Sequence, residues 1–417
     1  MSESQIRGWI VTFAGTGINL ALGVLYSWSV ISKALTKEWG WTAFNASLPY
    51  SIACGVFALV MVFAGRAQDK LGPRIVASLG GALTGIGLIV SSFASKDNLT
   101  LMVIGFGLLA GAGIGLGYAS ATPPAIKWFP PQKKGLISGI VVSGFGLASV
   151  YISPLTNSLL KSVGINKTFL TLGIAFFIVT VLLAQLLRDP PPGYAPKGMP
   201  TTPSGQAAAP KRYEYDWHEM LRTPQFYLLW LMYAFAAFAG LMIIGHMAKI
   251  AAKVLPNAQS LGFILVAVLA VFNATGRIVA GIVSDKIGRT RTMLLVFVSQ
   301  AIVMILFRYL NTTPLLLLGA AAVGFNYGAN LSLFPSTTAD FYGTKNLGVN
   351  YGLVFTAWGV GGVFGGQVAG KIVDATGSYD GAYMVAATLC ILAALLTFVT
   401  KPPKTVPVGE STAPAAN

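Results

Sequence analysis

The chain has 417 residues, of which 54% are hydrophobic and only 10% are charged, whereas soluble proteins carry about 25% charged residues. A chain this apolar cannot cover a water-exposed surface with polar groups, so a soluble globular protein is excluded. The net charge of +15 would suggest a nucleic-acid partner in a soluble protein, but these charges lie between hydrophobic blocks. We therefore expect the lipid bilayer as a partner and no nucleic acid. Cys54 and Cys390 lie far apart inside apolar blocks, which suggests neither a disulfide nor a metal site, and no cofactor is expected.

Hydrophobic blocks of about 20 residues recur along the chain, and each is long enough to cross the hydrocarbon core as a helix. Backbone groups in lipid must be bonded within their own segment, so helix is the expected state of every block. The first block is too long for the apolar region of a signal peptide and is expected to be a retained helix. We predict an all-α membrane protein with twelve spans, over residues 8–34, 45–65, 75–94, 101–126, 134–161, 168–187, 224–252, 258–283, 292–310, 314–337, 346–372 and 380–399.

The longest polar stretch lies between spans six and seven, from Arg188 to Thr223. Its Pro-, Ser- and Gly-rich sequence is typical of a linker, and Trp217–Met220 is expected to form a short surface helix at its end. The predicted organisation is a six-helix bundle over 1–187, a cytoplasmic linker over 188–223, a second, pseudo-symmetric six-helix bundle over 224–400 and a disordered cytoplasmic tail over 401–417.

An even number of spans places both termini on one side of the membrane. The loops on that side carry twice as many Lys and Arg residues as the loops on the other side. Because positive loops stay in the cytoplasm, we predict cytoplasmic termini in a multi-pass protein of a prokaryotic inner membrane.

Two loops show that the chain contains an internal repeat. These loops are Gly65–Arg74 and Gly281–Arg291, and the same four residues, Gly, Asp, Lys and Gly, occur in both with the same spacing. A second similarity between the halves is a tyrosine after a short glycine-containing stretch: Tyr118 follows Gly-Leu-Gly, and Tyr327 follows Gly-Phe-Asn. Half-chain repeats are typical of secondary transporters that bind substrate near the bilayer midplane between two bundles.

The repeated loops also carry candidate gating residues. Asp69 and Asp285 lie at helix ends, where Arg74, Arg289 or a helix N-terminus could pair with them. Breaking and remaking such pairs would bias the protein between inward-facing and outward-facing states. The alternative is that these charges only anchor the loops at the lipid headgroups.

The doubled pattern of Gly, Asp, Lys and Gly followed by basic residues resembles the signature of the major facilitator superfamily, over almost the whole chain. Finer motifs resemble the branch of monocarboxylate transporters and oxalate/formate antiporters: Gly23–Ser29, Lys127–Pro130 and Asn350–Gly352. This resemblance implies a monomeric transporter that works by alternating access, through proton symport or anion exchange. Within this branch, the chain resembles a bacterial lactate–proton symporter.

Arg277 is the strongest candidate for binding substrate. It is the only basic residue placed well within a predicted span, where an unpaired charge costs about 2.5–3.5 kcal/mol on insertion scales. A guanidinium stays protonated and binds a carboxylate through two parallel hydrogen bonds. The resemblance implies the same role, because an Arg in this span binds the substrate carboxylate in the family. The alternative is a structural Arg near the helix end.

Asn273 lies one turn before Arg277 on the same helix face. Many of the resembled monocarboxylate transporters carry there an Asp that is taken as a proton-coupling partner, so Asn puts an acidic relay in doubt. All 13 acidic residues lie in loops, tails or helix ends. His246 is then the leading proton carrier, because imidazole titrates near neutral pH. Alternatives are a neutral hydrogen-bonding His, a substrate that enters as the protonated acid, or a proton shared with Arg277 through a tyrosine.

Aromatic and apolar side chains are the candidates for the rest of the cavity. Tyr118 and Tyr327 are related by the repeat, so both can reach the cavity from opposite halves and bond a carboxylate or hydroxyl group. Leu25 and Tyr26 are expected to form an apolar wall. The alternative for all four is ordinary packing between helices.

Trp358 bears on selectivity. The resembled oxalate antiporter carries a Lys at this position, which pairs with the Arg to hold a dianion. One buried cation matches one carboxylate, and a second carboxylate would be desolvated without a partner. The sequence thus favours L-lactate, pyruvate or a similar short monocarboxylate, moved by proton symport, with an organic-anion exchanger as the alternative. An enzyme is not expected, because two histidines and no buried acid pair offer no convergent catalytic groups.

Overall fold

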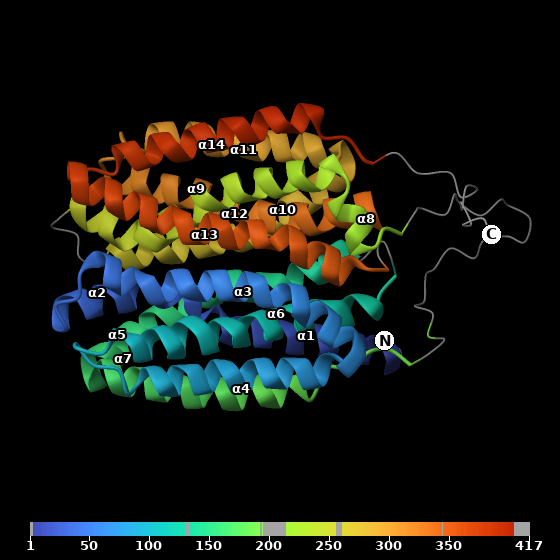
Figure 1. Ribbon diagram of the computed structural model, residues 1–417, viewed down its shortest axis with the longest axis horizontal. Coiled ribbons are helices and arrows are strands. Elements are labelled where there is room, and N and C mark those ends of the chain that lie inside the picture. Colours follow the sequence, from blue (N-terminus) through green and yellow to red (C-terminus); the bar gives the residue numbers. More distant parts are fainter. Residues whose placement is uncertain are drawn as a thin grey trace, which may run out of the picture.

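The computed structural model describes residues 3–130, 134–191, 194, 214–255, 261–343 and 345–403, and within these ranges it consists of helices without a β-sheet (Figure 1). The first half of the chain forms α1 (Glu3–Leu22), the 3₁₀ turn η1 (Gly23–Ser27), α2 (Trp28–Glu38), α3 (Ala43–Leu71), α4 (Pro73–Ser91), α5 (Leu99–Met102), the π-helical η2 (Val103–Ala110), α6 (Gly111–Lys127) and α7 (Lys134–Ala184). The second half forms α8 (Trp217–Leu221), α9 (Pro224–Val254), α10 (Leu261–Ile287), α11 (Arg289–Phe307), α12 (Thr313–Tyr342), α13 (Leu347–Thr376) and α14 (Asp380–Val399).

Eleven helical segments of the described chain are long and apolar enough to cross a membrane. The segment within α7 covers two of the predicted spans, because Gly164 interrupts its 51 residues with a φ of 77°. Gly144 packs against Thr16, and Leu183 packs against the neighbouring Gly17. The chain on either side of Gly164 therefore lies at the same level of α1, so α7 folds back and crosses twice. The predicted all-α membrane fold is confirmed.

The crossings form two groups that lie one above the other in Figure 1: α1 to α7 below and α9 to α14 above. The main contacts between the groups are made by α3 with α13 and by α7 with α10. The start of α1, the end of α14 and the short helix α8 lie at one end of the bundle (Figure 1), which we call the α8 end.

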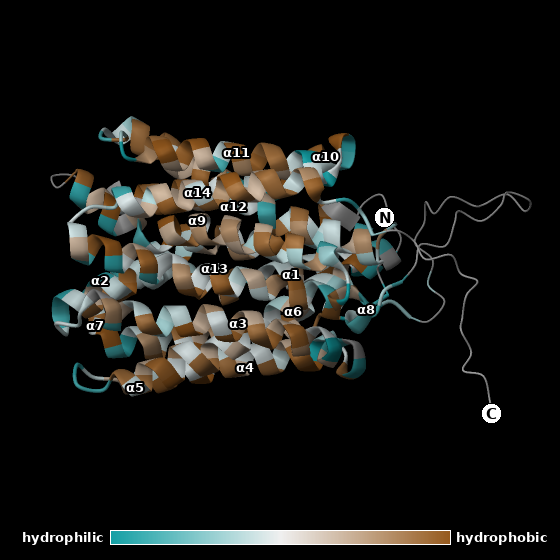
Figure 2. Cartoon of the chain, turned by 45° about the horizontal axis from the view of Figure 1, so that its top comes forward, coloured by the Kyte–Doolittle hydropathy of each residue, from teal (hydrophilic) through white to brown (hydrophobic). Residues whose placement is uncertain are grey.

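The outer surface of the bundle is apolar, as expected for contact with lipid. Phe63, Leu182 and Phe398 expose 72%, 64% and 66% of their area. Figure 2 shows hydrophobic residues along the lengths of the helices and hydrophilic residues mainly at the two ends. Such a surface is stable only when hydrocarbon covers it.

The expected short helix after the linker is present as α8. Asp216 caps it by accepting a hydrogen bond from the backbone of Glu219, whose side chain accepts one from the Asp216 backbone, so both terminal donors are satisfied. Met220 is fully buried. This helix is therefore anchored to the bundle at the point where the second half begins.

Candidate functional site

Arg277 lies near the middle of α10 and is almost completely buried, with 1% of its area exposed. Its Nε donates a hydrogen bond to Oδ1 of Asn273 at 3.0 Å, and its Nη1 donates to the carbonyl of Val142 on α7. A Cβ atom at Gly146 would lie 3.4 Å from both Cζ and Nη2 of Arg277. The guanidinium thus packs against α7, which belongs to the other half of the molecule.

The guanidinium is incompletely satisfied. Nη2 is buried and has no hydrogen-bond partner among the described residues, and Arg277 forms no ion pair within the described ranges. A buried donor without a partner costs free energy, and a charged one costs more. Both groups that hold Arg277, the amide of Asn273 and the carbonyl of Val142, are neutral. The arrangement leaves one positive charge that an anion could compensate.

Aromatic rings from both halves form one connected cluster where the halves meet. The ring of Phe57, on α3, lies between 5.2 and 5.9 Å from four other rings, those of Tyr118, Phe145, Phe355 and Trp358. Tyr118 and Phe355 belong to different halves and stack at 6.2 Å. The cluster therefore closes the space between the halves with flat apolar surfaces, and edge-to-face pairs of this kind add to the burial energy.

Hydroxyl groups lie within this aromatic cluster. Tyr26 and Tyr327 approach each other to 3.4 Å between their hydroxyl oxygens, and the indole nitrogen of Trp358 donates to the hydroxyl of Tyr327 at 2.8 Å. Arg277 is close to this cluster, because its guanidinium contacts Gly146, the residue that follows Phe145 in α7. The cluster thus provides polar groups at the end of otherwise apolar side chains, next to a single cation.

The break in the first span explains how Leu25 and Tyr26 reach the centre. The backbone tightens into the 3₁₀ turn η1 at Gly23, where a Cβ atom would lie 2.1 Å from that of Ala148 on α7. Leu25 and Tyr26 follow within this turn and are 3% and 6% exposed. Tyr26 packs edge-on against Phe145 at 5.2 Å. A close approach of α7 therefore accompanies the irregular backbone at the predicted wall.

The structure brings the six predicted substrate residues into one region. Asn273 bonds Arg277, Tyr26 and Tyr118 contact the same ring of Phe145, and Tyr327 meets Tyr26. Leu25 belongs to the same hydrophobic core. Trp358, predicted to bear on selectivity, joins this region through Tyr327.

Several residues of the region were missed by sequence reasoning: Phe57, Phe145, Tyr351 and Phe355. An aromatic residue in an apolar helix has the same sequence signal whether it faces lipid, a neighbouring helix or a cavity. Only the Asn-Tyr-Gly motif, which contains Tyr351, could have pointed to one of them.

His246 lies elsewhere, toward the end of α9 that is remote from α8. Its Nε2 lies 3.0 Å from the carbonyl oxygen of Gly366, and its Nδ1 lies 3.1 Å from the hydroxyl of Tyr379. A carbonyl can only accept, so this network places the proton on Nε2 and lets Nδ1 accept from Tyr379. Among the described residues, no hydrogen bond, ion pair or ring contact joins this buried ring to Arg277 or to the aromatic cluster. In this arrangement both nitrogens of the imidazole have a hydrogen-bond partner.

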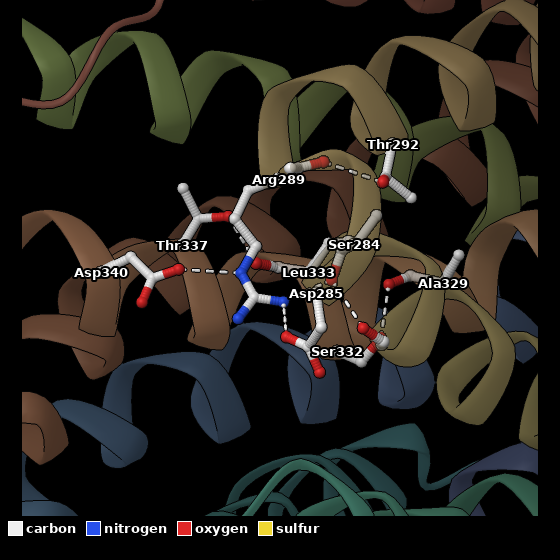
Figure 3. A network of polar contacts seen from close by, with 11 residues as sticks. Ser284, Asp285, Arg289, Thr292, Ala329, Ser332, Leu333, Thr337 and Asp340 are labelled. Carbon is white, nitrogen blue, oxygen red and sulfur yellow. Dashed lines mark hydrogen bonds and ion pairs between the residues drawn. The ribbon is translucent and has the colours of Figure 1, made fainter. Parts of the chain in front are cut away.

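The repeated loop of the second half forms a charge network at the α8 end, shown in Figure 3. Arg289 pairs with Asp285 at 2.7 Å and with Asp340 of α12 at 2.8 Å, and it also donates to Ser284. Asp285 and Arg289, considered above as one possible pair, are paired in the structure, and Asp340 is a partner that the repeat did not reveal. In the first half, Arg74 lies half-buried in α4, and the side chain of Asp69 lies outside the described part.

Comparison with known proteins places the chain among transporters. It is 32% identical to an uncharacterised MFS-type transporter of Escherichia coli, YhjX, over 87% of each chain. It is also 32% identical to the oxalate:formate antiporter of Oxalobacter formigenes, over 90% of this chain and 87% of that one. Monocarboxylate transporter 13 of Rattus norvegicus is 25% identical over 91% of this chain and 85% of its own length.

A family model agrees with these relatives along the whole length of the chain. The model described as Major Facilitator Superfamily matches residues 9–255 and 249–416. Together with the multi-pass helical bundle, this match shows that the chain belongs to the Major Facilitator Superfamily.

Proposed function

We propose that the protein is a monomeric secondary active transporter of a short monocarboxylate such as L-lactate or pyruvate, moved with a proton by alternating access. The observation that carries this proposal is the buried Nη2 of Arg277, which has no partner among the described residues. A substrate carboxylate bound there would replace the missing partner with a charge-assisted hydrogen bond and compensate the buried charge. In this proposal the α8 end faces the cytoplasm of a prokaryote, and the bundle spans its inner membrane.

The electrostatics of the region favour a monoanion. Arg277 is the one cation that the described contacts place at the aromatic cluster, and Trp358 contributes a neutral donor there. A second carboxylate would have to be desolvated without a second cation, which costs several kcal/mol. The named relatives include both monocarboxylate transporters and an oxalate:formate antiporter, so charge count is the feature that separates the two substrate classes.

Proton coupling in this proposal does not use an acid beside Arg277, because its neighbour is Asn273 rather than Asp. Protonation of His246 would put a proton on Nδ1, which now faces the Tyr379 hydroxyl, and would add charge between α9, α13 and the start of α14. We propose His246 as the proton-responsive group on these grounds. Entry of the substrate as the undissociated acid is the alternative.

The proposal is tested by uptake of labelled L-lactate into proteoliposomes with an imposed inward proton gradient and no internal substrate. We expect accumulation that a protonophore abolishes. Arg277→Ala should reduce uptake to the level of empty liposomes, because it removes the one positive charge that the described residues place beside the carboxylate. Arg308→Ala is the matched control and should retain uptake. It removes an exposed Arg at the end of the molecule opposite the α8 end.

Two outcomes would overturn parts of the proposal. Normal uptake by a folded Arg277→Ala variant would remove Arg277 from the site. Uptake that requires liposomes preloaded with another organic acid would replace symport with exchange, which is the mode named for the Oxalobacter relative.

A further inference from the structure

We propose that Trp358 is a positioning residue for the substrate site, which fixes the direction of the Tyr327 hydroxyl so that Tyr327 donates its proton to the bound carboxylate. This inference rests on the proposed monocarboxylate function and deepens it. It gives Trp358 a role of its own, in addition to leaving this position without a second cation.

The direction of the hydrogen bond between the two side chains is unambiguous. The indole nitrogen of Trp358 lies 2.8 Å from the hydroxyl oxygen of Tyr327, and both side chains are only 2% exposed. An indole N–H can donate but cannot accept, whereas a phenol can do both. Tyr327 is therefore the acceptor of this bond, and its own proton must point to another partner.

The other partner that the described contacts give Tyr327 is a weak one. The hydroxyl oxygen of Tyr26 lies 3.4 Å away, beyond the usual 2.5–3.0 Å range of O–H···O hydrogen bonds. An ionised carboxylate is a stronger acceptor and makes bonds of about 2.5–2.7 Å to hydroxyl groups. The proton of Tyr327 is thus poorly used without substrate and is available to a carboxylate that enters beside it.

Trp358 is itself held firmly by neighbouring rings. Phe355 stacks on it at 5.0 Å with 16° between the planes, and Phe57 of the other half meets it at 5.2 Å with an angle of 66°. One ring that stacks on the face of the indole and a second ring that packs at a steep angle to it restrict rotation of the indole. A fixed indole N–H in turn restricts the Tyr327 hydroxyl, which lowers the ordering cost of substrate binding.

A tryptophan is well suited to this task beside Arg277. A lysine at the same place would also donate a hydrogen bond, but it would add a second positive charge. The neutral indole orients the tyrosine and leaves the charge at the cluster unchanged. Trp358 therefore meets two requirements: it orients the donor hydroxyl of Tyr327, and it adds no second cation to the cluster.

The test is a double-mutant cycle on L-lactate binding in nanodiscs, with Trp358→Phe, Tyr327→Phe and the double variant. Hydrogen bonds to charged groups contribute about 1.5–3 kcal/mol, so Tyr327→Phe should raise the Kd about tenfold or more. Trp358→Phe keeps a flat ring and should raise the Kd severalfold. The double variant should bind no more weakly than Tyr327→Phe, because Trp358 acts through the hydroxyl that this variant lacks.

The matched control is Trp230→Phe. Trp230 also donates its indole N–H to a hydroxyl on α13, that of Thr356 at 2.8 Å, and the contacts described here do not connect it with Tyr327. This variant should leave the Kd unchanged. A loss of affinity equal to that of Trp358→Phe would mean that any removed indole weakens binding through structure, which would overturn the inference.

A spectroscopic measurement tests the hydrogen bond between Trp358 and Tyr327 independently of substrate binding. With ¹⁵N-labelled indoles, the signal of Trp358 among the eight tryptophans is identified by its loss in Trp358→Phe. It should move upfield in Tyr327→Phe, and an unchanged position would overturn the inference. Additive changes of the Kd in the double-mutant cycle would also overturn the inference. They would leave the proposed function intact. A wild-type protein that binds no monocarboxylate would overturn both proposals, so the two failures are distinguishable.

Discussion

His246 shows how one residue can link three helices through a single ring. It is 7% exposed, it lies on α9, and its two nitrogens contact Gly366 of α13 and Tyr379 at the start of α14. A proton added to Nδ1 would replace an acceptor by a donor opposite a hydroxyl group. The tyrosine can turn to accept, but the added charge remains in a buried place, so protonation favours any state in which this region is wetter.

We predict that His246→Ala flattens the dependence of L-lactate uptake on external pH and leaves the Kd within about threefold of the wild-type value. The reason is that the buried ring accepts a proton readily only in a state in which its region is wetter, so its protonation is coupled to the change of state, while the described contacts of His246 do not reach the Arg277 region. The measurement is initial uptake rate from pH 5.5 to 8. His218→Ala, at a side chain on α8 that is 62% exposed, is the control. A pH profile that matches the wild type would exclude His246 as the proton-responsive group.

Sequence reasoning works best at residues whose burial is expensive. Arg277 could be found because a charge in an apolar block needs a reason, and Asn273 followed from its spacing. The bond from Trp358 to Tyr327 could not be found, because it joins α13 to α12 and depends on the orientation of two rings. Phe57 was missed for a similar reason, since its ring contacts come from α6, α7 and α13.

At the scale of elements, the segment before α8 is tied to the turn between α12 and α13. Tyr215 donates its backbone N–H to the carbonyl of Tyr342 at 3.0 Å. The carbonyl of Tyr215 accepts hydrogen bonds from the side chains of Asn346 at 3.0 Å and Asn350 at 3.1 Å. Asn350 is fully buried. The first residue of the Asn-Tyr-Gly motif therefore anchors the segment that precedes the second half.

We predict that Asn350→Ala lowers the free energy of unfolding by about 1 kcal/mol, the usual net value of one hydrogen bond. Asn346 still bonds the same carbonyl, which limits the loss. Thermal unfolding in detergent measures the stability, and limited proteolysis of the linker should become faster. Asn311→Ala, at an exposed turn residue, is the control. Equal protease sensitivity in the two variants would show that Asn350 does not hold the segment.

Helices were also predictable as elements, but their irregularities were not. Each long apolar block is a helix because lipid leaves no other state for the backbone. The 3₁₀ turn at Gly23–Ser27 and the π-helical stretch at Val103–Ala110 lie inside two of these blocks. They accompany close contacts of neighbouring helices, such as Gly107 with Ile52, and such contacts are not visible in a single span.

At the scale of the whole molecule, the two halves meet backbone to backbone on the side of the α8 end. A Cβ atom at Gly65 would lie 3.0 Å from the carbonyl carbon of Gly348, and one at Gly352 would lie 2.9 Å from Cα of Val62. Figure 1 shows the helices that carry these residues, α3 and α13, side by side. Glycines thus permit a tight seal between the halves here, and the alternating access that we propose requires that this seal open.

We predict that Gly65→Leu shifts the protein toward a state that is open at the α8 end. The added side chain meets the backbone at Gly348, which cannot move aside as a flexible side chain can. Native Cys54 reports the change, because it is fully buried against Gly362 of α13, where a Cβ atom would lie 3.6 Å from its sulfur. Labelling of Cys54 by a small maleimide should become severalfold faster, with mass spectrometry separating it from Cys390. Gly370→Leu, at a position with open space around it, should leave the rate unchanged. If a folded Gly65→Leu protein keeps Cys54 as unreactive as in the wild type, the contact of α3 with α13 does not control access from that end.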